Sequence, residues 1–116
     1  MNILLIGLGG FFGAISRYLF SILINPINNF PLATLIVNIF GCFFIGLLFG
    51  LNIGLKDNLY YFFGIGFIGS FTTMSAFTLQ SIQLTESNGF IASISYVLLT
   101  FLLTIIATIV GINIGR

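Results

Sequence analysis

Long apolar runs separated by short polar clusters dominate the sequence. A helix needs roughly 20 residues to cross the hydrocarbon of a bilayer, and four runs are long enough. The polar clusters between them contain Asn, Pro, Gly and charged residues, which are typical of turns. The pattern predicts an all-α membrane protein, with one transmembrane domain over residues 1–116. The predicted transmembrane helices cover about residues 3–24, 31–54, 59–84 and 90–114.

The amino-acid composition supports a membrane protein and excludes some kinds of site. Of the 116 residues, 59% are hydrophobic and 4% are charged, whereas a soluble domain carries about a quarter charged residues. The sequence has no histidine and a single cysteine, Cys42, which excludes a disulfide within the chain and a Cys/His metal site. We expect Cys42 to pack as a small hydrophobic residue. The first run lacks a preceding basic residue and a cleavage site, so we expect a retained span.

Glycine and hydroxyl residues interrupt the third run between Gly64 and Thr78. This stretch holds three glycines and five Ser or Thr residues. Backbone groups freed at membrane depth need other protein or a water-lined path as partners, and broken helices there usually belong to ion or substrate sites. We therefore expect a helix that is broken near the middle of the membrane. The alternative is a glycine packing face whose hydroxyls bond back to their own helix.

Small and polar residues recur at every fourth position of the first run. These positions are Gly9, Gly13, Arg17 and Ser21. Residues four apart share one face of a helix, so we expect this face to meet protein and not lipid. Arg17 either extends its long side chain to the headgroups or is buried in a structural or ion-attracting role.

The same spacing continues in the second run. It is occupied by Thr34, Asn38, Cys42, Gly46, Gly50 and Gly54. Asn38 is the least expected residue, because an amide in hydrocarbon needs a partner. Asn38 is therefore either a packing contact between helices or an uncharged donor that faces an anion.

Four hydroxyl side chains lie along one side of the predicted fourth helix. They belong to Tyr96, Thr100, Thr104 and Thr108. Each step of four residues turns the helix by about 400°, so the stripe winds slowly, by about 40° per step. A threonine hydroxyl can bond back to the preceding turn without another partner. Four in register nevertheless favour a polar path.

Three motifs together resemble the Fluc (CrcB) fluoride-channel family. They read Gly9-Gly10-Phe-Phe-Gly13-Ala14-Ile-Ser-Arg17-Tyr18, Thr34-Leu35-Ile-Val37-Asn38-Ile-Phe-Gly41 and Gly66-Phe-Ile-Gly69-Ser70-Phe71-Thr72-Thr73-Met74-Ser75-Ala76-Phe77. Their order and spacing cover nearly the whole chain, which makes the match specific. The resemblance implies a passive channel that exports fluoride across the cell (inner or plasma) membrane.

The resemblance also implies an assembly. It predicts an antiparallel, dual-topology dimer with two fluoride pathways and one structural sodium ion at its centre. We expect a homodimer, with a heterodimer formed with a homologue as the alternative. Charge gives little preference for one orientation, because Lys56 and Arg116 fall on one side of the membrane and Arg17 lies nearer the other.

Site residues follow from the same resemblance. The family's pore asparagine corresponds to Asn38, and its polar track corresponds to Thr34 and Ser75, with Tyr96 contributing from the last span. To these the hydroxyl stripe of the last span adds Thr100 and Thr104 as predicted pathway residues. The backbone carbonyls of Gly69 and Thr72 would bind the sodium ion. Arg17 matches the family's arginine in the first span.

The sequence departs from the family's pattern at three positions. The family's pair of phenylalanines falls on Met74 and Phe77, so the first of the pair is methionine here. Ala76 stands where a threonine is usual, and Gln80 stands where a glutamate is common. These changes concern the aromatic pair and part of the polar track, while the predicted fold is unaffected.

Two other classes of membrane protein share parts of this pattern. A small multidrug-resistance-type exporter has four spans, but it exchanges protons through a carboxylate within the membrane, and Asp57 and Glu86 are both predicted to lie in loops. A non-conducting subunit that needs a homologous partner would explain the glycine faces but not Asn38 or the threonine stripe. We expect neither catalytic activity nor a nucleic-acid partner.

Overall fold

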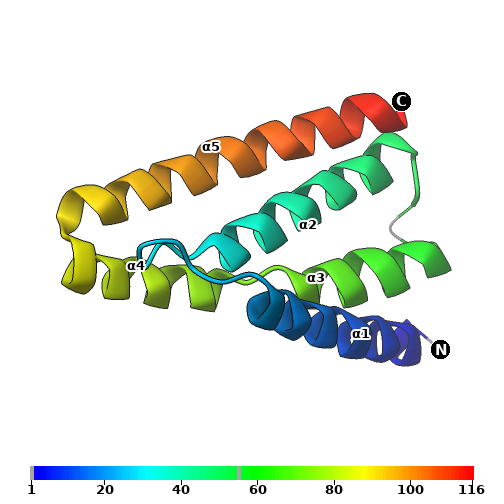
Figure 1. The fold of residues 1–116 in the computed structure, drawn as a ribbon. Helices are drawn as coiled ribbons and strands as arrows, with labels where there is room; N and C mark the ends of the chain where they lie inside the picture. Colours follow the sequence, from blue (N-terminus) through cyan, green and yellow to red (C-terminus); the bar gives the residue numbers. More distant parts are fainter. Residues whose placement is uncertain (1, 55) are drawn as a thin grey trace.

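The computed structural model describes residues 2–54 and 56–116. Within them, four helical segments are long and apolar enough to cross a membrane, which confirms the predicted class. Three are single helices, namely α1 (Asn2–Leu23), α2 (Leu32–Gly50) and α5 (Phe90–Gly115). The remaining segment consists of η1 (Tyr60–Ile68), α3 (Gly69–Phe71) and α4 (Met74–Asn88) (Figure 1).

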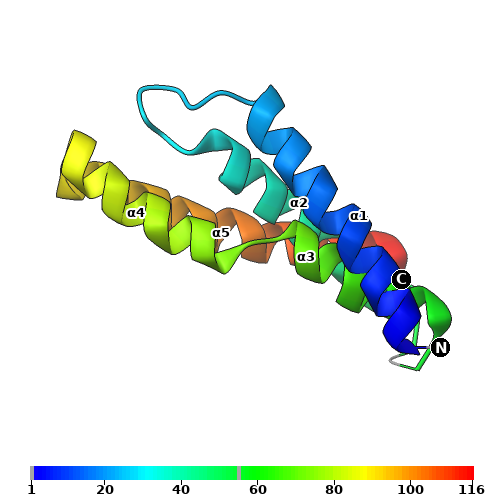
Figure 2. The ribbon, with the colours of Figure 1, turned by 90° about the horizontal axis from the view of Figure 1, so that it is seen from below.

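The helices pack as two pairs that the interrupted segment connects. α2 lies along α5, and α1 lies along η1 and α3, while α4 packs against α5 (Figures 1 and 2). Both termini lie at one end of the molecule (Figure 1). The molecule extends 46 Å along its longest axis, enough to cross the hydrocarbon and the headgroups, which together are about 40–45 Å thick.

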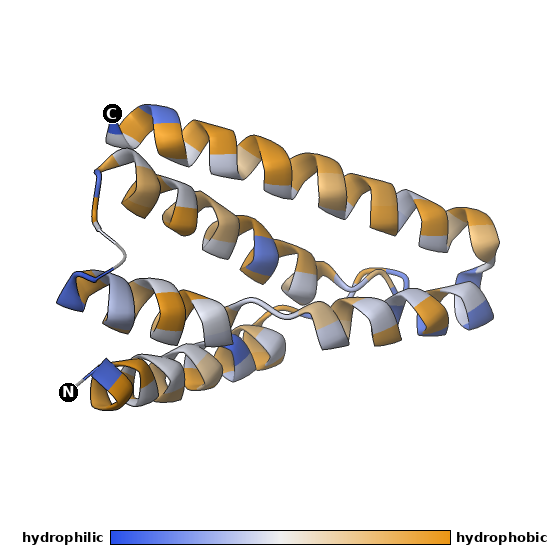
Figure 3. Ribbon diagram, turned by 180° about the vertical axis from the view of Figure 1, so that it is seen from behind, coloured by the Kyte–Doolittle hydropathy of each residue, from blue (hydrophilic) through white to orange (hydrophobic). Residues whose placement is uncertain are grey.

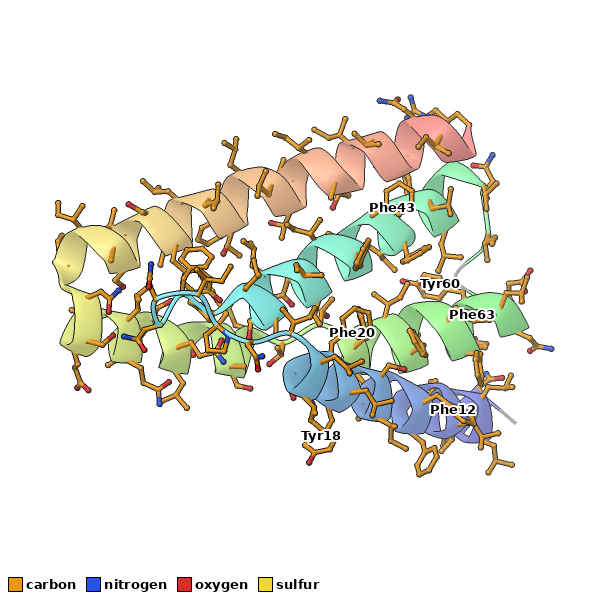
Figure 4. All side chains as sticks on the ribbon, viewed as in Figure 1. Phe12, Tyr18, Phe20, Phe43, Tyr60 and Phe63 are labelled. Atoms are coloured by element: carbon orange, nitrogen blue, oxygen red, sulfur yellow. The ribbon has the colours of Figure 1, made fainter. Side chains whose placement is uncertain are left out.

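Apolar side chains cover the outer surface of the bundle. Hydrophilic residues lie mainly at helix ends and in the connections (Figure 3). On α1, Tyr18 points away from the bundle, whereas Phe20 lies toward α3 (Figure 4). The Phe20 ring contacts the Phe71 ring edge to face at 5.5 Å between centroids. Side chains of this kind suit a lipid environment on the outside and protein contacts within.

Glycines let both helix pairs approach at the backbone. A Cβ atom on Gly13 of α1 would overlap the carbonyl of Phe67, and one on Gly46 of α2 would overlap the carbonyl of Thr108. Gly9 and Gly13 are the buried residues of α1. The glycine spacing of the first run thus marks a protein contact, as predicted.

Two predicted boundaries are wrong. The second helix ends at Gly50 and not at Gly54, and Asn52 follows with a φ of 59°. The predicted loop at 86–89 is reduced to Gly89, because α4 continues to Asn88. The polar residues there do not need a loop, since Ser87 Oγ donates to the Leu84 carbonyl and Asn88 Nδ2 donates to the Asn28 carbonyl.

The third segment is broken at Thr72 and Thr73. Both residues are extended, with ψ values of 155° and 119°. The prediction placed the interruption within 64–78, and the break lies inside that stretch. The nine-residue π-helix η1 before it was not predicted. Such wider turns are rare and frequently occur at functional sites.

Candidate functional site

Asn38 joins α2 to the break in the third segment. Its Nδ2 donates to the Thr73 carbonyl at 3.2 Å, and its Oδ1 accepts from the Thr73 amide at 2.9 Å. The side chain is buried, with 8% of its surface exposed. It therefore pairs with the extended backbone as a neighbouring strand would. The second hydrogen on Nδ2 is not used in this pairing.

Arg17 of α1 contacts the third segment just before the break. Its Nε donates to the Ser70 carbonyl at 3.0 Å, and the residue is half-buried. Of the two roles left open by the sequence, this contact favours burial over extension to the headgroups. Arg17 and Asn38 together hold the interrupted backbone between α1 and α2.

The two carbonyls predicted to bind sodium lose their regular helical donors. In a continuous helix the Thr73 amide would donate to the Gly69 carbonyl, but here it donates to Asn38 Oδ1. The Ala76 amide would likewise donate to the Thr72 carbonyl, but here it donates to Thr73 Oγ1 at 3.1 Å. Both carbonyl oxygens are therefore released by the geometry of the break. Oxygen donors of this type suit a hard cation.

Seven of the predicted site residues meet at one concave region, the central hollow. It has a volume of about 390 Å³ and lies between α2, the third segment and α5. These seven residues are Asn38, Gly69, Thr72, Met74, Phe77, Thr100 and Thr104. The hollow therefore brings together polar groups from three separate spans.

Two buried hydroxyls lie near Phe77: Thr100 lines the central hollow, whereas Tyr96 is enclosed behind it. The Tyr96 ring lies 5.3 Å from the Phe77 ring between centroids, and Thr100 is one helical turn further along α5. Within residues 2–54 and 56–116, the Tyr96 and Thr100 hydroxyl oxygens are buried and lie near each other, and neither makes a well-formed hydrogen bond. Leaving such a group unpaired costs about 1–3 kcal/mol. A ligand that accepts hydrogen bonds would remove this cost.

The remaining hydroxyls of the α5 stripe are already used. Thr104 Oγ1 donates to the Thr100 carbonyl at 2.6 Å, and Thr108 Oγ1 donates to the Thr104 carbonyl at 3.0 Å. The stripe thus divides into an unpaired half at Tyr96 and Thr100 and a back-bonded half at Thr104 and Thr108. Sequence spacing alone gave no sign of this division.

Thr34 lies further out, beside Gln80 of α4. Thr34 Oγ1 donates to Gln80 Oε1 at 2.5 Å. Both residues line a region of about 250 Å³, the entry hollow, with Arg17 and Thr73. Both also line a region of about 350 Å³ that reaches Asn29 and Ser87, the outer mouth. Thr73 belongs to the central hollow as well. The three regions therefore adjoin one another at shared lining residues.

The paired positions Met74 and Phe77 differ in burial. Met74 is 65% exposed in the single chain, whereas Phe77 is 7% exposed. Phe77 also packs edge to face on Phe101 at 6.1 Å. Phe77 is therefore fixed by its neighbours, while Met74 lies at the open side of the central hollow.

Ser75 was predicted as a pathway residue, whereas Thr73 was not predicted as a site residue. Ser75 is exposed, and its Oγ lies 3.3 Å from Thr73 Oγ1. It does not line the central hollow. Thr73 was not selected, although it caps α4 and contacts Asn38. A threonine just before a helical run is a typical N-cap signal and could have identified it.

Comparisons with known proteins show the family of this chain. A family model described as "CrcB-like protein, Camphor Resistance (CrcB)" matches residues 4–112. The chain is 39% identical over 115 residues to the "Fluoride-specific ion channel FluC" of Azobacteroides pseudotrichonymphae genomovar. CFP2, covering 95% of this chain and 92% of the relative. It is 42% identical over 114 residues to "Fluoride-specific ion channel FluC 1" of Methanosarcina acetivorans, covering 95% and 87%. It is 39% identical to the protein of that name in Listeria innocua serovar 6a, covering 99% and 98%.

Proposed function

Because the chain belongs to the CrcB-like protein family, we propose that it is a passive, fluoride-selective ion channel of the cell membrane. Fluoride would leave the cell through it, which lowers the internal concentration and toxicity of fluoride. The relatives named fluoride-specific channels support this ion. The observation that carries the proposal is the pair of buried, unpaired hydroxyls of Tyr96 and Thr100 beside Phe77.

The chemistry of these groups suits fluoride. Fluoride is small and strongly hydrated, so a selective path must replace its water with hydrogen-bond donors. The hydroxyls of Tyr96 and Thr100 and the second Nδ2 hydrogen of Asn38 are donors without a fixed charge. The edge of the Phe77 ring adds a region of positive potential. Such groups stabilise an anion without trapping it as a nearby cation would.

We place the pathway along the adjoining regions. Fluoride would enter at the outer mouth, pass Thr34 and Gln80 in the entry hollow, and reach Asn38 and Thr100 in the central hollow. Met74 would line the open side of this path, and Ser75 would reach it only through its contact with Thr73 Oγ1. Thr104 would line its far end, although its own hydroxyl proton is bonded within α5.

A second copy of the chain would complete the site. Gly69 and Met74 are exposed in the single chain, and the carbonyl of Gly69 has lost its helical donor. Such a polar group cannot face hydrocarbon without cost. A second copy, inserted in the opposite orientation, would cover the central hollow and give two pathways. A homologous chain could take its place in a heterodimer.

The second copy of the chain would also create a cation site at the dimer axis. The carbonyls of Gly69 and Thr72 from both copies would bind one sodium ion. The fit is supported by the loss of their helical donors to Asn38 and Thr73. When bound, the ion would supply positive charge near the two pathways. No catalytic reaction is part of this function.

The proton-coupled exporter is not favoured. It requires a carboxylate within the membrane. Asp57 lies in the connection between α2 and η1, and Glu86 is exposed two residues before the end of α4. Neither carboxylate lines the central hollow.

Fluoride efflux from liposomes tests the proposed function. The purified protein is reconstituted, and the release of fluoride is followed with an ion-selective electrode. We expect rapid release of fluoride and no comparable release of chloride. Equal release of both anions, or release of neither, would contradict the proposal.

A further inference from the structure

The backbone at the end of α3 divides between two neighbours. Gly69 and Thr72 line the central hollow beside α2 and α5. Ser70, between them in sequence, faces α1 instead: its carbonyl accepts from Arg17 Nε at 3.0 Å. The Ser70 hydroxyl would lie 3.1 Å from a Cβ atom on Gly10 of the same helix. The carbonyl of Ser70 is therefore withheld from the central hollow.

Arg17 makes this contact through one particular atom. The guanidinium group has five N–H donors, and the Nε–H donates to the backbone carbonyl. The residue also lines the entry hollow with Thr34 and Thr73. Its contact with the break is thus a directed hydrogen bond and not a distant charge effect.

The break is held on each side by one side chain. The Thr73 amide has left the helical pattern and donates to Asn38 Oδ1, and the carbonyls of Gly69 and Thr72 have lost their helical donors, so side chains help to fix the break. Asn38 holds the Thr73 side of the break. Arg17 holds the Ser70 side. The turn itself is held by the Thr72 amide, which donates to the Ile68 carbonyl at 3.0 Å, and by the buried Phe71 ring. Without Arg17 the Ser70 carbonyl would lose its partner on α1, and the Gly69 and Thr72 carbonyls on either side of it would shift with it.

We infer that Arg17 is a positioning residue for the proposed sodium site, because it holds the Ser70 carbonyl against α1 and leaves the Gly69 and Thr72 carbonyls facing the central hollow. This inference rests on the proposed function. In this role Arg17 acts through the hydrogen bond that its Nε donates. A role in attracting fluoride would instead depend on its positive charge.

Two substitutions separate the donor from the charge. In Arg17→Gln the amide nitrogen is the same number of bonds from Cα as Nε, so the donor is kept and the charge is lost. In Arg17→Met both donor and charge are lost at similar length. Lys56→Gln is the matched control, because it removes the same charge from an exposed residue outside the helices.

The measurement is the thermal unfolding of each purified protein as sodium replaces choline at constant ionic strength. A bound ion raises the unfolding temperature with its concentration, which gives an apparent affinity. The sodium dependence of fluoride efflux is recorded on the same samples. The first readout does not depend on conduction.

We expect Arg17→Gln and Lys56→Gln to keep the sodium dependence of the wild type within about threefold. Arg17→Met should need about tenfold more sodium, the effect of losing one hydrogen bond of about 1.4 kcal/mol. A shift of about tenfold in Arg17→Gln would overturn the inference in favour of a charge effect, even if Arg17→Met fails to fold. If the wild type shows no sodium dependence, the proposed sodium site itself is wrong.

Discussion

Asn38 pairs with both backbone groups of Thr73, through Nδ2 at 3.2 Å and Oδ1 at 2.9 Å. This relationship joins the two interpretations that the sequence left open for Asn38. The residue is a contact between helices, and the group it contacts is the break at the candidate site. One amide hydrogen is still available for an ion.

Asn38→Asp tests this double role. The carboxylate keeps an acceptor for the Thr73 amide but loses the donor to the Thr73 carbonyl and adds a negative charge. We expect fluoride efflux to fall by at least about tenfold, the effect of one lost hydrogen bond, while the protein still elutes as a dimer from a sizing column. Asn58→Asp, at an exposed position, is the matched control. Wild-type efflux in Asn38→Asp would reduce Asn38 to a packing residue.

Thr100 and Thr104 form a matched pair on α5. The Thr100 hydroxyl is buried and unpaired, whereas the Thr104 hydroxyl donates to the Thr100 carbonyl. Thr100→Val should leave the free energy of unfolding unchanged or raise it by about 1 kcal/mol, because it removes an unpaired polar group. The same variant should conduct poorly, while Thr104→Val should conduct nearly as the wild type. Efflux and thermal unfolding in detergent give both values. Equal efflux in the two variants would show that the unpaired hydroxyl is not a ligand.

Phe77 and Met74 should respond differently to substitution. Phe77 is buried against Tyr96 and Phe101 and presents a fixed ring, so Phe77→Ile should strongly reduce efflux. Met74 is exposed in the single chain, and Met74→Phe should leave efflux equal or higher. Normal efflux in Phe77→Ile would exclude the ring edge as a ligand. A silent wild type that Met74→Phe activates would favour a heterodimer with a homologue that supplies the missing ring.

Gly69→Leu tests whether a second copy of the chain covers the central hollow. Within the single chain, a Cβ atom on Gly69 comes no nearer than 3.8 Å to its closest neighbour, the Gly64 carbonyl. A Cβ atom therefore has room in the single chain, where Gly69 is exposed, and we expect the conflict to come from a partner that covers the central hollow. We expect Gly69→Leu to fold with normal helical content and to elute as a monomer. Gly7→Leu, at a position with nothing within 4 Å, should remain dimeric. A conducting Gly69→Leu dimer would contradict this arrangement.

The sequence predicted the four spans and the interrupted third segment because both depend on local composition. Long apolar runs and a stretch rich in glycine and hydroxyls mark them without reference to other residues. The site was predicted less completely, because its details depend on contacts between spans. The acceptor for Thr34 is Gln80 of another helix, and the acceptor for Thr104 is the backbone of its own helix. No spacing rule distinguishes these outcomes.

The role of Arg17 shows the same limit. Its position near the end of an apolar run is compatible with a side chain that reaches the headgroups. The bond to the Ser70 carbonyl follows only from the packing of α1 against α3. That packing in turn depends on small residues of α1: Gly13 lets the backbone approach the Phe67 carbonyl of η1, and a Cβ atom on Gly10 would come within 3.1 Å of the Ser70 hydroxyl.

The central claim is that the unpaired hydroxyls of Thr100, which lines the central hollow, and of Tyr96, which is buried beside Phe77, let fluoride cross the membrane selectively. It is tested most directly by efflux from liposomes that contain the wild type or the double variant Tyr96→Phe with Thr100→Val. Fluoride and chloride release are compared at equal gradients and equal protein density. We predict fast, fluoride-selective release by the wild type and loss of that release in a double variant that still folds as a dimer. Unchanged fluoride release by the double variant, or chloride release equal to fluoride release by the wild type, would contradict the account.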